Sequence, residues 1–390
     1  MTVPGKGGLE DVVVTTSAIC DIDGVVGDGK VAKLWYRGYD VNDLISNNVN
    51  YEAVSYLLRY GELPTSAELA AYTDRLVKSR ELAGPVVDLL KSLPKETHPL
   101  VAYRTAMSAS AAYDPEAESM EKDANERKGD RVIAGTPTMV AAWRRSREGK
   151  DVIAPRAELS HAANFMYMMT GEEPSAQVTK TMDVALLLHA EHEFNASTFA
   201  ARVATATEAD MHSAVVAAIG VLKGPKHGGA NEDVVDMLDE IGTAVNAEPW
   251  VRAKLEYRKT LPPAERQSIR ARIPGFGHRV YRITDPRSVH LRAEGARLAE
   301  EKGLSDRFQI LEIVRGIVEK ELGLPVNVDY YSAGVYGALG IPTDFATSIF
   351  AVARTSGWIA HITEQLANNR LIRPRSDYIG YAPRAAHPIQ

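Results

Sequence analysis

Apolar side chains recur at helical spacing along most of the chain after its first forty residues. In the stretch PTSAELAAYTDRL, Leu69, Tyr72 and Leu76 fall on one face of a helix. Thr65 precedes this pattern, and Glu68 stands three residues further on, which is the spacing of a capping box. The sequence therefore predicts a helix that begins just after Thr65.

Two later stretches show the same periodicity. Ser175 is the candidate cap of the first, EEPSAQVTKTMDVALLLHAEHE, which continues through Val184, Leu187 and Leu188. Thr343 starts the second, PTDFATSIFAVARTSGWIAHITEQLANN, which predicts a long helix. The apolar stripe of this helix consists of Phe345, Ile349, Phe350 and Ala353.

Short β-strands are predicted only near the start of the chain. β-Branched and aromatic residues dominate two runs there, DVVVTTSAICDIDG and KLWYRGYD, which are bounded by Gly and Asp. The regular alternation of strands and helices that a doubly wound fold requires does not follow them. These patterns predict a mainly α, multihelical fold with short β strands near the N-terminus.

Two polar stretches lack clear periodicity, and we expect them to be irregular. They are AAYDPEAESMEKDANERKGDR at 111–131, interpreted as an exposed connection, and LEYRKTLPPAERQSIR at 255–270, interpreted as part of a mobile region. No repeat of about 20–50 residues is visible, so a solenoid is not expected.

The composition is that of an ordinary soluble globular protein, with 45% hydrophobic and 25% charged residues. A length of 390 residues suggests two or three domains. Because the net charge is −6, no general basic field attracts nucleic acid or an anionic membrane. Binding of an anionic ligand would therefore depend on arginines placed locally.

Cys20 is the only cysteine, which excludes an intramolecular disulfide and a cysteine-based zinc site and fits a reducing compartment. The first residues, MTVPGKGGLEDVVV, contain no long apolar region after a basic start. No run approaches the ~18 apolar residues of a membrane-spanning helix. We therefore expect a cytoplasmic protein.

The stretch LKGPKHGGANED surrounds His227 with small or rigid residues, namely Gly224, Pro225, Gly228 and Gly229. A helix is predicted after this turn, with apolar positions at Val234, Val235 and Leu238. The positive end of its dipole would keep the ring neutral, so that the ring can donate a hydrogen bond to an oxygen that becomes negative. A helix-entry turn whose histidine only caps local carbonyls explains the same pattern.

A second glycine-flanked histidine occurs in PGFGHRVYRITDPR. Gly275 and Gly277 permit positive φ angles and close backbone approach, and they present His278 and Arg279 on a turn. Arg287 follows nine residues after the histidine. An isolated histidine of this kind is usually a turn residue. The stretch lacks the third glycine of a dinucleotide-binding fingerprint, and KGPKHGG does not match a phosphate-binding P-loop.

His189 and His192 stand three residues apart in HAEHEFNAST, near the expected end of a helix. Their order matches neither HExxH nor HxxEH, and no cysteine lies nearby, so a metal site is disfavoured. We favour one histidine that binds a substrate carbonyl or carboxylate. A core or capping role is expected for at least one of the two.

Asp329, in PVNVDYYSAG, is the acidic candidate. The apolar segment before it and its neighbours Tyr330 and Tyr331 predict partial burial. Burial raises the pKa of a carboxyl and makes its carboxylate a stronger base. An aspartate that merely starts a helix is the alternative.

Three arginines are candidates for binding a small dicarboxylate through paired hydrogen bonds. Arg354 interrupts the apolar stretch SIFAVARTSGW, where an unpaired charge is costly. Arg373 lies in LIRPRS, and Arg287 follows the second glycine turn. Each one alone is more often part of a structural ion pair.

The histidines, Asp329 and the three arginines together match what carbon–carbon bond formation with carboxylate substrates requires. Such a reaction requires a base beside a thioester carbonyl, a neutral donor for the enol(ate) and a donor to the electrophile.

In these motifs the chain resembles the citrate synthase family along nearly its whole length. The resemblance is carried by LWYRGYDVNDL, LLRYGELPTSAEL, SHAANFMYMMTGEEPS, HAEHEFNASTFAARV, GPKHGGANE, PGFGHRVYRITDPR, NVDYYSAG, IFAVARTSGWIAHITEQ and NRLIRPRSDYIG, in the order and spacing of the family. It implies a mostly helical homodimer. It also implies a large domain formed by residues 1–223 and 338–390 and a mobile small domain inserted at 224–337.

Residue roles are implied by the same resemblance. Asp329 would take a methyl proton from acetyl-CoA, His227 would stabilise the resulting enol, and His278 would donate to the oxaloacetate carbonyl. The residues that would bind oxaloacetate are His192, Arg287, Arg354 and, from the other subunit, Arg373. The residues that would contact CoA are Arg272, Ile273, Pro274, Gly275, Phe276 and Gly277. The CoA thioester is a co-substrate, and no metal or tightly bound cofactor is implied.

The chain looks like the short, dimeric prokaryotic type of the family rather than the larger hexamers controlled by NADH. 2-Methylcitrate synthase, which uses propionyl-CoA, shares AEHEFNASTF, GPKHGGANE and the IRP ending, so these motifs do not separate the two activities. We favour citrate synthase. Outside the family, the alternatives are a hydrolase with a histidine-bound metal and a non-catalytic helical binding protein.

Overall fold

The computed structural model describes residues 12–24, 31–224, 227–228, 230–266, 271–278 and 280–386 of the 390-residue chain. Within these residues most of the chain is helical, and strands occur only before residue 41. The predicted mainly α fold with short N-terminal strands is therefore confirmed.

The N-terminal sheet has three antiparallel strands in the order β1 (Cys20–Asp23), β2 (Lys33–Tyr36) and β3 (Tyr39–Asp40). The predicted run KLWYRGYD forms β2 and β3, joined by a turn in which Arg37 and Gly38 have φ angles of 52° and 89°. The prediction of strand over the run before Cys20 is wrong for residues 12–19. These residues have no neighbouring strand to pair with, because β2 is paired only with β1 and β3. Asp11 of that run lies outside the described residues.

Most helices form a body around the last one. Its members are α1 (Val41–Ser46), α2 (Tyr51–Tyr60), α3 (Ser66–Lys78), α4 (Gly84–Ser92), α5 (Pro99–Ala111), α6 (Lys122–Arg147), α7 (His161–Thr170), α8 (Ala176–His189), α9 (Ala196–Ala206), α10 (Met211–Leu222), the 3-10 turn η2 (Thr343–Phe345) and α16 (Ala346–Ala367). α16 is buried over most of its length and packs against α2, α5, α6, α8, α9 and α10. Such a helix needs apolar or satisfied polar residues on every side, which explains why its sequence is apolar beyond a single stripe.

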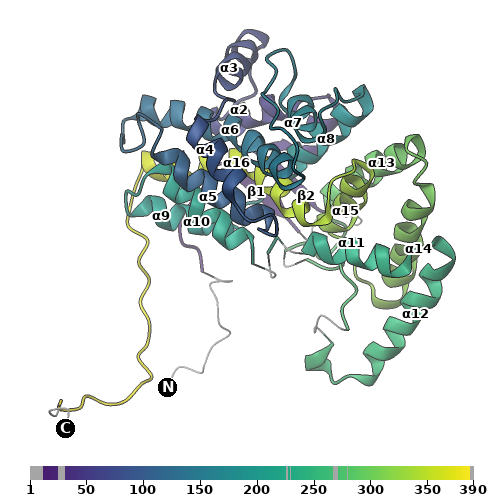
Figure 1. Cartoon of the computed structure of the whole chain (residues 1–390). Helices are drawn as coiled ribbons and strands as arrows, with labels where there is room; N and C mark the ends of the chain where they lie inside the picture. The colour runs from purple at the N-terminus through teal and green to yellow at the C-terminus, as the bar shows by residue number, and fades with distance from the viewer. Residues whose placement is uncertain are drawn as a thin grey trace.

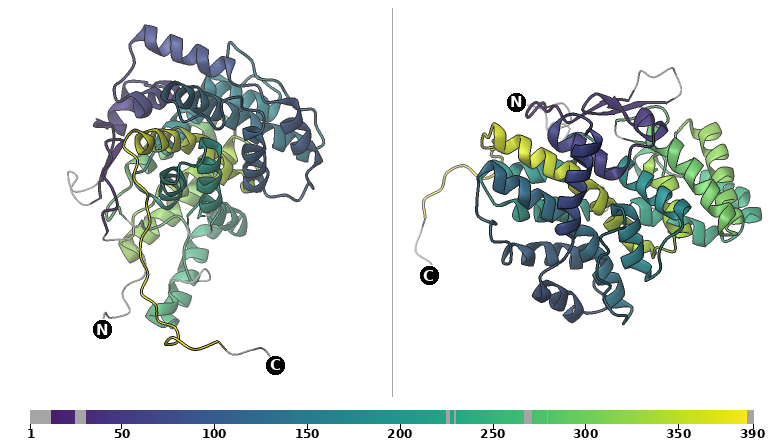
Figure 2. Two further views of the ribbon diagram at one scale, coloured as in Figure 1. Left: turned by 90° about the vertical axis from the view of Figure 1, so that its left-hand side faces the viewer. Right: turned by 90° about the horizontal axis from the view of Figure 1, so that it is seen from above.

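A second group of helices lies on one side of this body, in green at the right of Figure 1. It consists of α11 (Ala230–Ile241), α12 (Ala244–Thr260), the 3-10 turn η1 (Pro263–Glu265), α13 (Pro286–Glu301), α14 (Ser305–Leu322) and α15 (Val328–Ala338). These helices pack mainly on one another, and they reach the body through α13 against α8 and α11 against α16. Figure 2 shows the chain after α16 running away from the body as an extended segment.

The predicted helix starts at Thr65 and Ser175 are confirmed. The Thr65 hydroxyl accepts the N–H of Glu68, and the Glu68 carboxylate accepts the N–H of Thr65, so the capping box is closed at α3. Ser175 caps α8 by accepting the N–H of Val178. The chain also turns helical at Thr343, first as η2 and then as α16.

The stretch 111–131 is not irregular throughout, because its second half is the start of α6. Charged residues there are buried with partners that sequence polarity does not reveal. Lys128 donates to two backbone carbonyl oxygens of the loop before α6, at 3.1 and 2.5 Å. Asp130 forms ion pairs with Arg59 and Arg75.

The stretch 255–270 was also expected to be irregular, and this is wrong for residues 255–260, which complete α12. Its first residue, Leu255, is buried in the second helix group, where α12 packs against α14. Residues 267–270 lie outside the described part of the chain. None of the described helices is long and apolar enough to span a membrane.

Candidate active site

His192 lies in a tight turn just after α8. The hydroxyl of Tyr36, from β2, lies 3.2 Å from the carbonyl oxygen of Leu187 and 3.0 Å from that of Glu191. The next residue, Glu193, has a φ of 55°, a left-handed conformation that is uncommon for residues other than glycine. The contacts around the turn therefore hold His192 in a position that the helix alone would not give it.

Two histidines and a tyrosine meet beside this turn. Nε2 of His192 and the hydroxyl oxygen of Tyr281 are 3.0 Å apart. The ring centroids of His192 and His278 are 5.2 Å apart, and those of His278 and Tyr281 are 4.6 Å apart. The structure thus brings the second glycine-flanked histidine onto the turn of the HAEHEFNAST motif.

The backbone determines the tautomer of His278. Its Nδ1 accepts hydrogen bonds from the N–H groups of Val280 (3.0 Å) and Tyr281 (3.2 Å). Burial, and then the positive charge of Arg287, lowers the pKa of His278 to about 4, so the ring is neutral at pH 7. A neutral ring that accepts at Nδ1 carries its proton on Nε2, which is then available as a donor.

His227 occupies a turn in which the following residue has to be glycine. A Cβ on Gly228 would lie 2.6 Å from the carbonyl oxygen of Leu222 and 2.6 Å from Cγ2 of Thr347. Nε2 of His227 lies 3.0 Å from Oγ of Ser197, which leaves Nδ1 as the nitrogen that can face a ligand. The turn therefore presents one defined edge of the imidazole.

The predicted neutrality of His227 is confirmed, but its main cause differs from the expected helix dipole. Burial comes first and the positive charge of Arg354 second, and together they lower the pKa of His227 to about 4. Two other residues named in this turn, Pro225 and Gly229, lie outside the described residues, as does Arg279 in the second glycine turn.

Asp329 is half-buried near the start of α15. Asn327 caps this helix by accepting the N–H of Asp329 at 3.1 Å. Burial raises the pKa of the Asp329 carboxyl to about 6, although the positive charge of Arg287 opposes this shift. The predicted rise in the pKa of Asp329 is therefore confirmed, and the residue also stands at a helix start, as the alternative interpretation expected.

The glycine-rich loop before His278 packs against the start of α15. Gly275 has a φ of 80°, and a Cβ there would lie 2.5 Å from Cδ2 of Tyr330. The rings of Phe276 and Tyr330 are 4.9 Å apart. Since Tyr330 follows Asp329 directly, the loop is anchored beside the carboxylate. The other residues expected to contact CoA also lie in this segment: Arg272, Ile273, Pro274 and Gly277.

Arg354 has guanidinium donors without a protein acceptor. Its Nε donates to the carbonyl oxygen of His189 at 2.8 Å, and its Cζ lies 4.7 Å from the ring centre of Phe350. Both Nη groups are buried and have no hydrogen-bond partner among the described residues. Burial lowers the pKa of Arg354, and the charge of Glu191 partly offsets this. A bound carboxylate would satisfy the two unpaired groups.

The other arginines differ in their surroundings. Arg287 is buried and forms a two-contact pair with Asp285, at 3.0 and 2.7 Å. Arg272 is paired with Asp233 of α11. Arg373 is exposed in the extended segment after α16 and does not join the cluster within one chain. Of the predicted oxaloacetate ligands, the structure therefore brings together His192, Arg287 and Arg354.

His189, the other histidine of the motif, is bound within its own helix. Its Nδ1 lies 2.7 Å from the carbonyl oxygen of Ala185, and burial lowers its pKa to about 3. This is the core role expected for one of the pair. In the described ranges, no group of three or more His, Cys, Asp or Glu side chains is placed to hold a metal ion.

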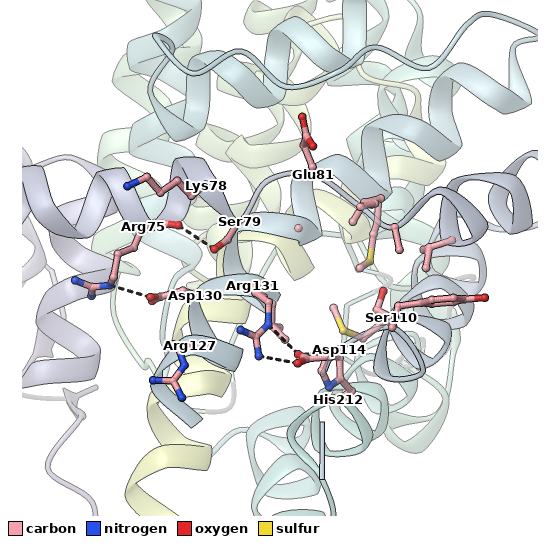
Figure 3. Close-up of a pocket in the computed structure, with 18 residues that line it drawn as sticks. Arg75, Lys78, Ser79, Glu81, Ser110, Asp114, Arg127, Asp130, Arg131 and His212 are labelled. Atoms are coloured by element: carbon pink, nitrogen blue, oxygen red, sulfur yellow. Dashed lines mark hydrogen bonds and ion pairs between the residues drawn. The ribbon is translucent and has the colours of Figure 1, made fainter. Parts of the chain in front are cut away.

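A separate cleft of about 380 Å³ lies between α3, α4, α5 and α6, near the start of α10 (Figure 3). None of the residues predicted as site residues lines it. Its cationic side chains already have partners, for example Arg75 with Asp130 and Arg131 with Asp114. We therefore locate the chemistry at the histidine cluster and not in this cleft.

Several residues of the cluster were missed by sequence reasoning. Ser197 and Tyr281 stand within the quoted motifs, and this membership was the available signal. Asp285 directly precedes the Pro-Arg pair of the motif that contains Tyr281. Glu191 and His361 also stand within quoted motifs, but their contact has no signal in the sequence, because only the fold brings them together.

The fold and this cluster define a multihelical enzyme built for acid–base chemistry next to bound carboxylates. The chain belongs to the citrate synthase family, since the family described as citrate synthase, C-terminal domain, matches residues 8–375. It is 46% identical over 384 residues to citrate synthase 2 of Bacillus subtilis, covering 98% of both chains. It is 39% identical over 367 residues to 2-methylcitrate synthase of Shewanella oneidensis, covering 94% of this chain and 92% of the relative.

Solved structures agree with the family assignment. The citrate synthase of Thermoplasma acidophilum, in a ternary complex with carboxymethyl coenzyme A and oxaloacetate, superposes with a TM-score of 0.88 at 31% identity. This match covers 98% of this chain and 97% of that one. The predicted citrate-synthase-like fold is therefore confirmed.

Proposed function

We propose that this enzyme is a citrate synthase that condenses acetyl-CoA with oxaloacetate and water to give citrate and CoA. It is thus an acyltransferase that converts the acyl group to an alkyl group on transfer. The observation that carries the proposal is the pairing of a carboxyl whose pKa is raised, Asp329, with two histidines that are neutral at pH 7, His227 and His278. Reaction beside a thioester carbonyl needs these three groups in these protonation states.

The first step forms the enol of acetyl-CoA. Asp329 takes one methyl proton, and the carbonyl oxygen of the thioester gains negative charge. His227 donates to that oxygen from Nδ1. This requires Nε2 to accept the proton of Ser197, and Ser197 in turn accepts a hydrogen bond from Nε1 of Trp358 at 3.2 Å. A neutral donor suits an enol oxygen because it stabilises charge without transferring a proton early.

The second step forms the carbon–carbon bond. The enol(ate) carbon attacks the ketone carbon of oxaloacetate, and Nε2–H of His278 gives its proton to the ketone oxygen as that oxygen becomes an alkoxide. The proton taken up by Asp329 then returns to His278 through water, so both groups regain their starting states. His192, Arg287 and Arg354 hold the two carboxylates, with the unpaired Nη groups of Arg354 as the strongest donors available. Water then cleaves the thioester of the condensed product, which releases citrate and CoA.

CoA binding is assigned to the loop beside Asp329. Ile273, Pro274, Gly275, Phe276 and Gly277 line the adenine in this proposal, and the contacts of Gly275 and Phe276 with Tyr330 keep this loop next to the segment that carries Asp329. Arg272 is the weaker candidate for a phosphate contact, since its guanidinium is already paired with Asp233. The ligands of the Thermoplasma acidophilum complex, carboxymethyl coenzyme A and oxaloacetate, support the pair of substrates.

The proposal includes a moving domain. Residues 224–337 would form the small domain, which carries His278 and Asp329, and residues 1–223 and 338–390 would form the large domain, which holds oxaloacetate. The self-contained packing of α11–α15 supports this division. Closure would exclude water while the enol exists. A cytoplasmic location also belongs to the proposal, and the single Cys20 is in keeping with it.

A homodimer in which Arg373 completes the other subunit's site is supported by the exposure of this residue on an extended segment. Mixed dimers test it. When Asp329→Asn and Arg373→Ala subunits are reassociated, one site of each mixed dimer regains both residues if Arg373 acts across the interface. About a quarter of wild-type activity should then return. If Arg373 acts within its own chain or not at all, mixing restores nothing.

2-Methylcitrate synthase is the second candidate, because relatives with that activity match this chain over nearly its full length. One methylene changes binding in an apolar pocket by only ~1–3 kcal/mol, so the same acid–base apparatus serves both thioesters. Comparison of kcat/KM for acetyl-CoA and propionyl-CoA at saturating oxaloacetate decides between them. We expect acetyl-CoA to be preferred, and a clear preference for propionyl-CoA would overturn this part of the proposal.

A further inference from the structure

A line of buried hydrogen bonds runs from α9 through α16 to the turn that carries His192. Arg202 donates from Nε and Nη2 to Nδ1 of His361, at 2.9 and 2.8 Å. Nε2 of His361 lies 3.1 Å from Oε1 of Glu191, and the same oxygen accepts the N–H of His192 at 2.8 Å. The three side chains are 2% exposed or less, so water does not compete for these bonds.

Each bond in this line has a defined direction. A guanidinium only donates, so Nδ1 of His361 has to be an acceptor and its proton has to be on Nε2. That proton is donated to Glu191. Burial raises the pKa of the Glu191 carboxyl, but His361, Arg354 and the N–H of His192 together outweigh burial, and the pKa is lowered. The group next to His192 is therefore a carboxylate that accepts from Nε2 of His361.

The backbone of α16 contacts the same carboxylate one helical turn before His361. A Cβ on Gly357 would overlap Oε2 of Glu191 and the carbonyl oxygen of Ala190. The Glu191 carboxylate therefore lies directly against the face of α16 that carries His361. This matters because the residue after His192, Glu193, has a left-handed conformation that surrounding contacts have to maintain.

We propose that His361 is a positioning residue for oxaloacetate binding. Held by Arg202, it fixes the Glu191 carboxylate and thereby orients the peptide and the ring of His192. The inference rests on the proposed function, in which His192 contacts oxaloacetate. His361 acts through Glu191 and does not contact the substrate.

His361→Leu tests the proposal, because it removes both hydrogen bonds and leaves the charge unchanged. The KM for oxaloacetate should rise about 10-fold or more, while the KM for the acyl-CoA at saturating oxaloacetate stays within about twofold. The value of kcat should fall by a smaller factor than KM rises. His361→Gln should restore most of the affinity, since an amide can accept from Arg202 and donate to Glu191 at once.

The control is His161→Leu, which removes a similarly buried imidazole whose Nε2 has no hydrogen-bond partner within the described part of the chain. It should leave the KM for oxaloacetate unchanged. If His361→Leu does not fold, His361→Asn provides the same comparison with His361→Gln, because the shorter amide does not span both partners. Folding is checked by thermal unfolding of each variant.

The outcomes separate this inference from the proposed function. An unchanged KM for oxaloacetate in a folded His361→Leu protein, with an active wild type, would contradict the positioning role alone. Equal losses in the Leu and Gln variants would also contradict it, since they would indicate a packing effect. A wild-type enzyme that neither binds oxaloacetate by calorimetry nor consumes it with acetyl-CoA or propionyl-CoA would instead remove the proposed function.

Discussion

The two sides of the site are held in different ways. On the α8–α16 side, Arg354 and His192 are fixed by buried hydrogen bonds from helices and by the line through His361. On the α11–α15 side, His278 and Asp329 stand on a turn and a helix start, anchored by glycine-permitted backbone contacts. In the proposed function, the first side would bind the dicarboxylate, whereas the second would contribute the reacting groups.

This difference suggests that the two sides have separate functions. In the proposed mechanism, oxaloacetate meets a preformed surface, and catalysis then depends on how accurately the second side is placed against it. Changes on the α11–α15 side should mainly affect kcat or acyl-CoA binding, except at Arg287 of α13, which is proposed to bind oxaloacetate from this side. Changes on the α8–α16 side should mainly affect oxaloacetate binding.

The largest effect is expected from Asp329→Asn. The amide cannot accept the methyl proton, so kcat should fall by about 10³-fold or more. Oxaloacetate should still bind with nearly unchanged affinity, as measured by calorimetry, because Asp329 is not among its proposed ligands. A near-wild-type kcat, or a loss of oxaloacetate binding comparable to the loss of kcat, would contradict the separate functions of the two sides.

Arg354→Lys tests the α8–α16 side of the site. It keeps the charge but replaces two Nη groups by one ammonium, so kcat/KM for oxaloacetate should fall about 10²-fold. The KM for acetyl-CoA at saturating oxaloacetate should change little. Arg75→Lys, in the distant cleft, is the matched control and should behave as wild type. Steady-state kinetics of the three proteins would refute the assignment if Arg354→Lys and Arg75→Lys were equally active.

Gly275→Ala tests the anchoring of the CoA loop. The φ of 80° and the contact with Tyr330 both oppose a side chain there, so the loop should shift and the KM for acetyl-CoA should rise about 10-fold. Gly303→Ala has a similar strain, with a φ of 68°, but nothing lies within 4 Å of its Cβ. This control should lose some stability without a change in KM. Equal KM values for the two variants would count against the loop assignment.

The pH dependence of kcat/KM should show a smaller effect, which also comes from Asp329 on the α11–α15 side. The pKa of Asp329 is raised from 3.8 to about 6, so kcat/KM should fall as the pH drops through about 6 and the base becomes protonated. His227 and His278 titrate near 4 and should add no limb between pH 6 and 8. A wild-type profile with a histidine limb near 7 would contradict these protonation states.

Stability should respond to pH with a sign set by the same shift. A carboxyl whose pKa is raised in the folded state has its full cost to stability above about pH 6, where it is ionised in both states, and costs almost nothing below about pH 3, where it is protonated in both states. Asp329→Asn should therefore raise the free energy of unfolding at pH 8 by up to about 3 kcal/mol, and raise Tm with it, and should leave Tm unchanged at about pH 3. Thermal unfolding at fixed protein concentration measures this. A lower Tm at pH 8 would indicate that the carboxylate has a stabilising partner.

Local patterns in the sequence were sufficient for much of the fold. The cap at Thr65 and the apolar periodicity after Ser175 depend on neighbouring residues only, and both predictions are confirmed. The polar stretch that begins α6 was misread because Asp130 finds its partners, Arg59 and Arg75, on other helices. Partners distant in sequence have no local signature.

The same limit applies to the site. His227, His278 and Asp329 were found because glycine turns and flanking aromatic residues mark them within short motifs. The cause of the neutrality of His227 was misjudged, since burial by other elements is not visible in its own turn. The line from Arg202 through His361 to Glu191 joins three separate segments, and only the fold brings it together.

The central claim is that Asp329 and His227 together make the methyl carbon of acetyl-CoA nucleophilic. Exchange of the methyl protons with deuterated solvent measures this step by NMR. The reaction should contain malate, which has the carboxylates of oxaloacetate but no ketone to be attacked. The wild type should catalyse exchange that weakens below about pH 6, and Asp329→Asn should catalyse none. Exchange by Asp329→Asn at a near-wild-type rate would contradict the role of Asp329 as the base.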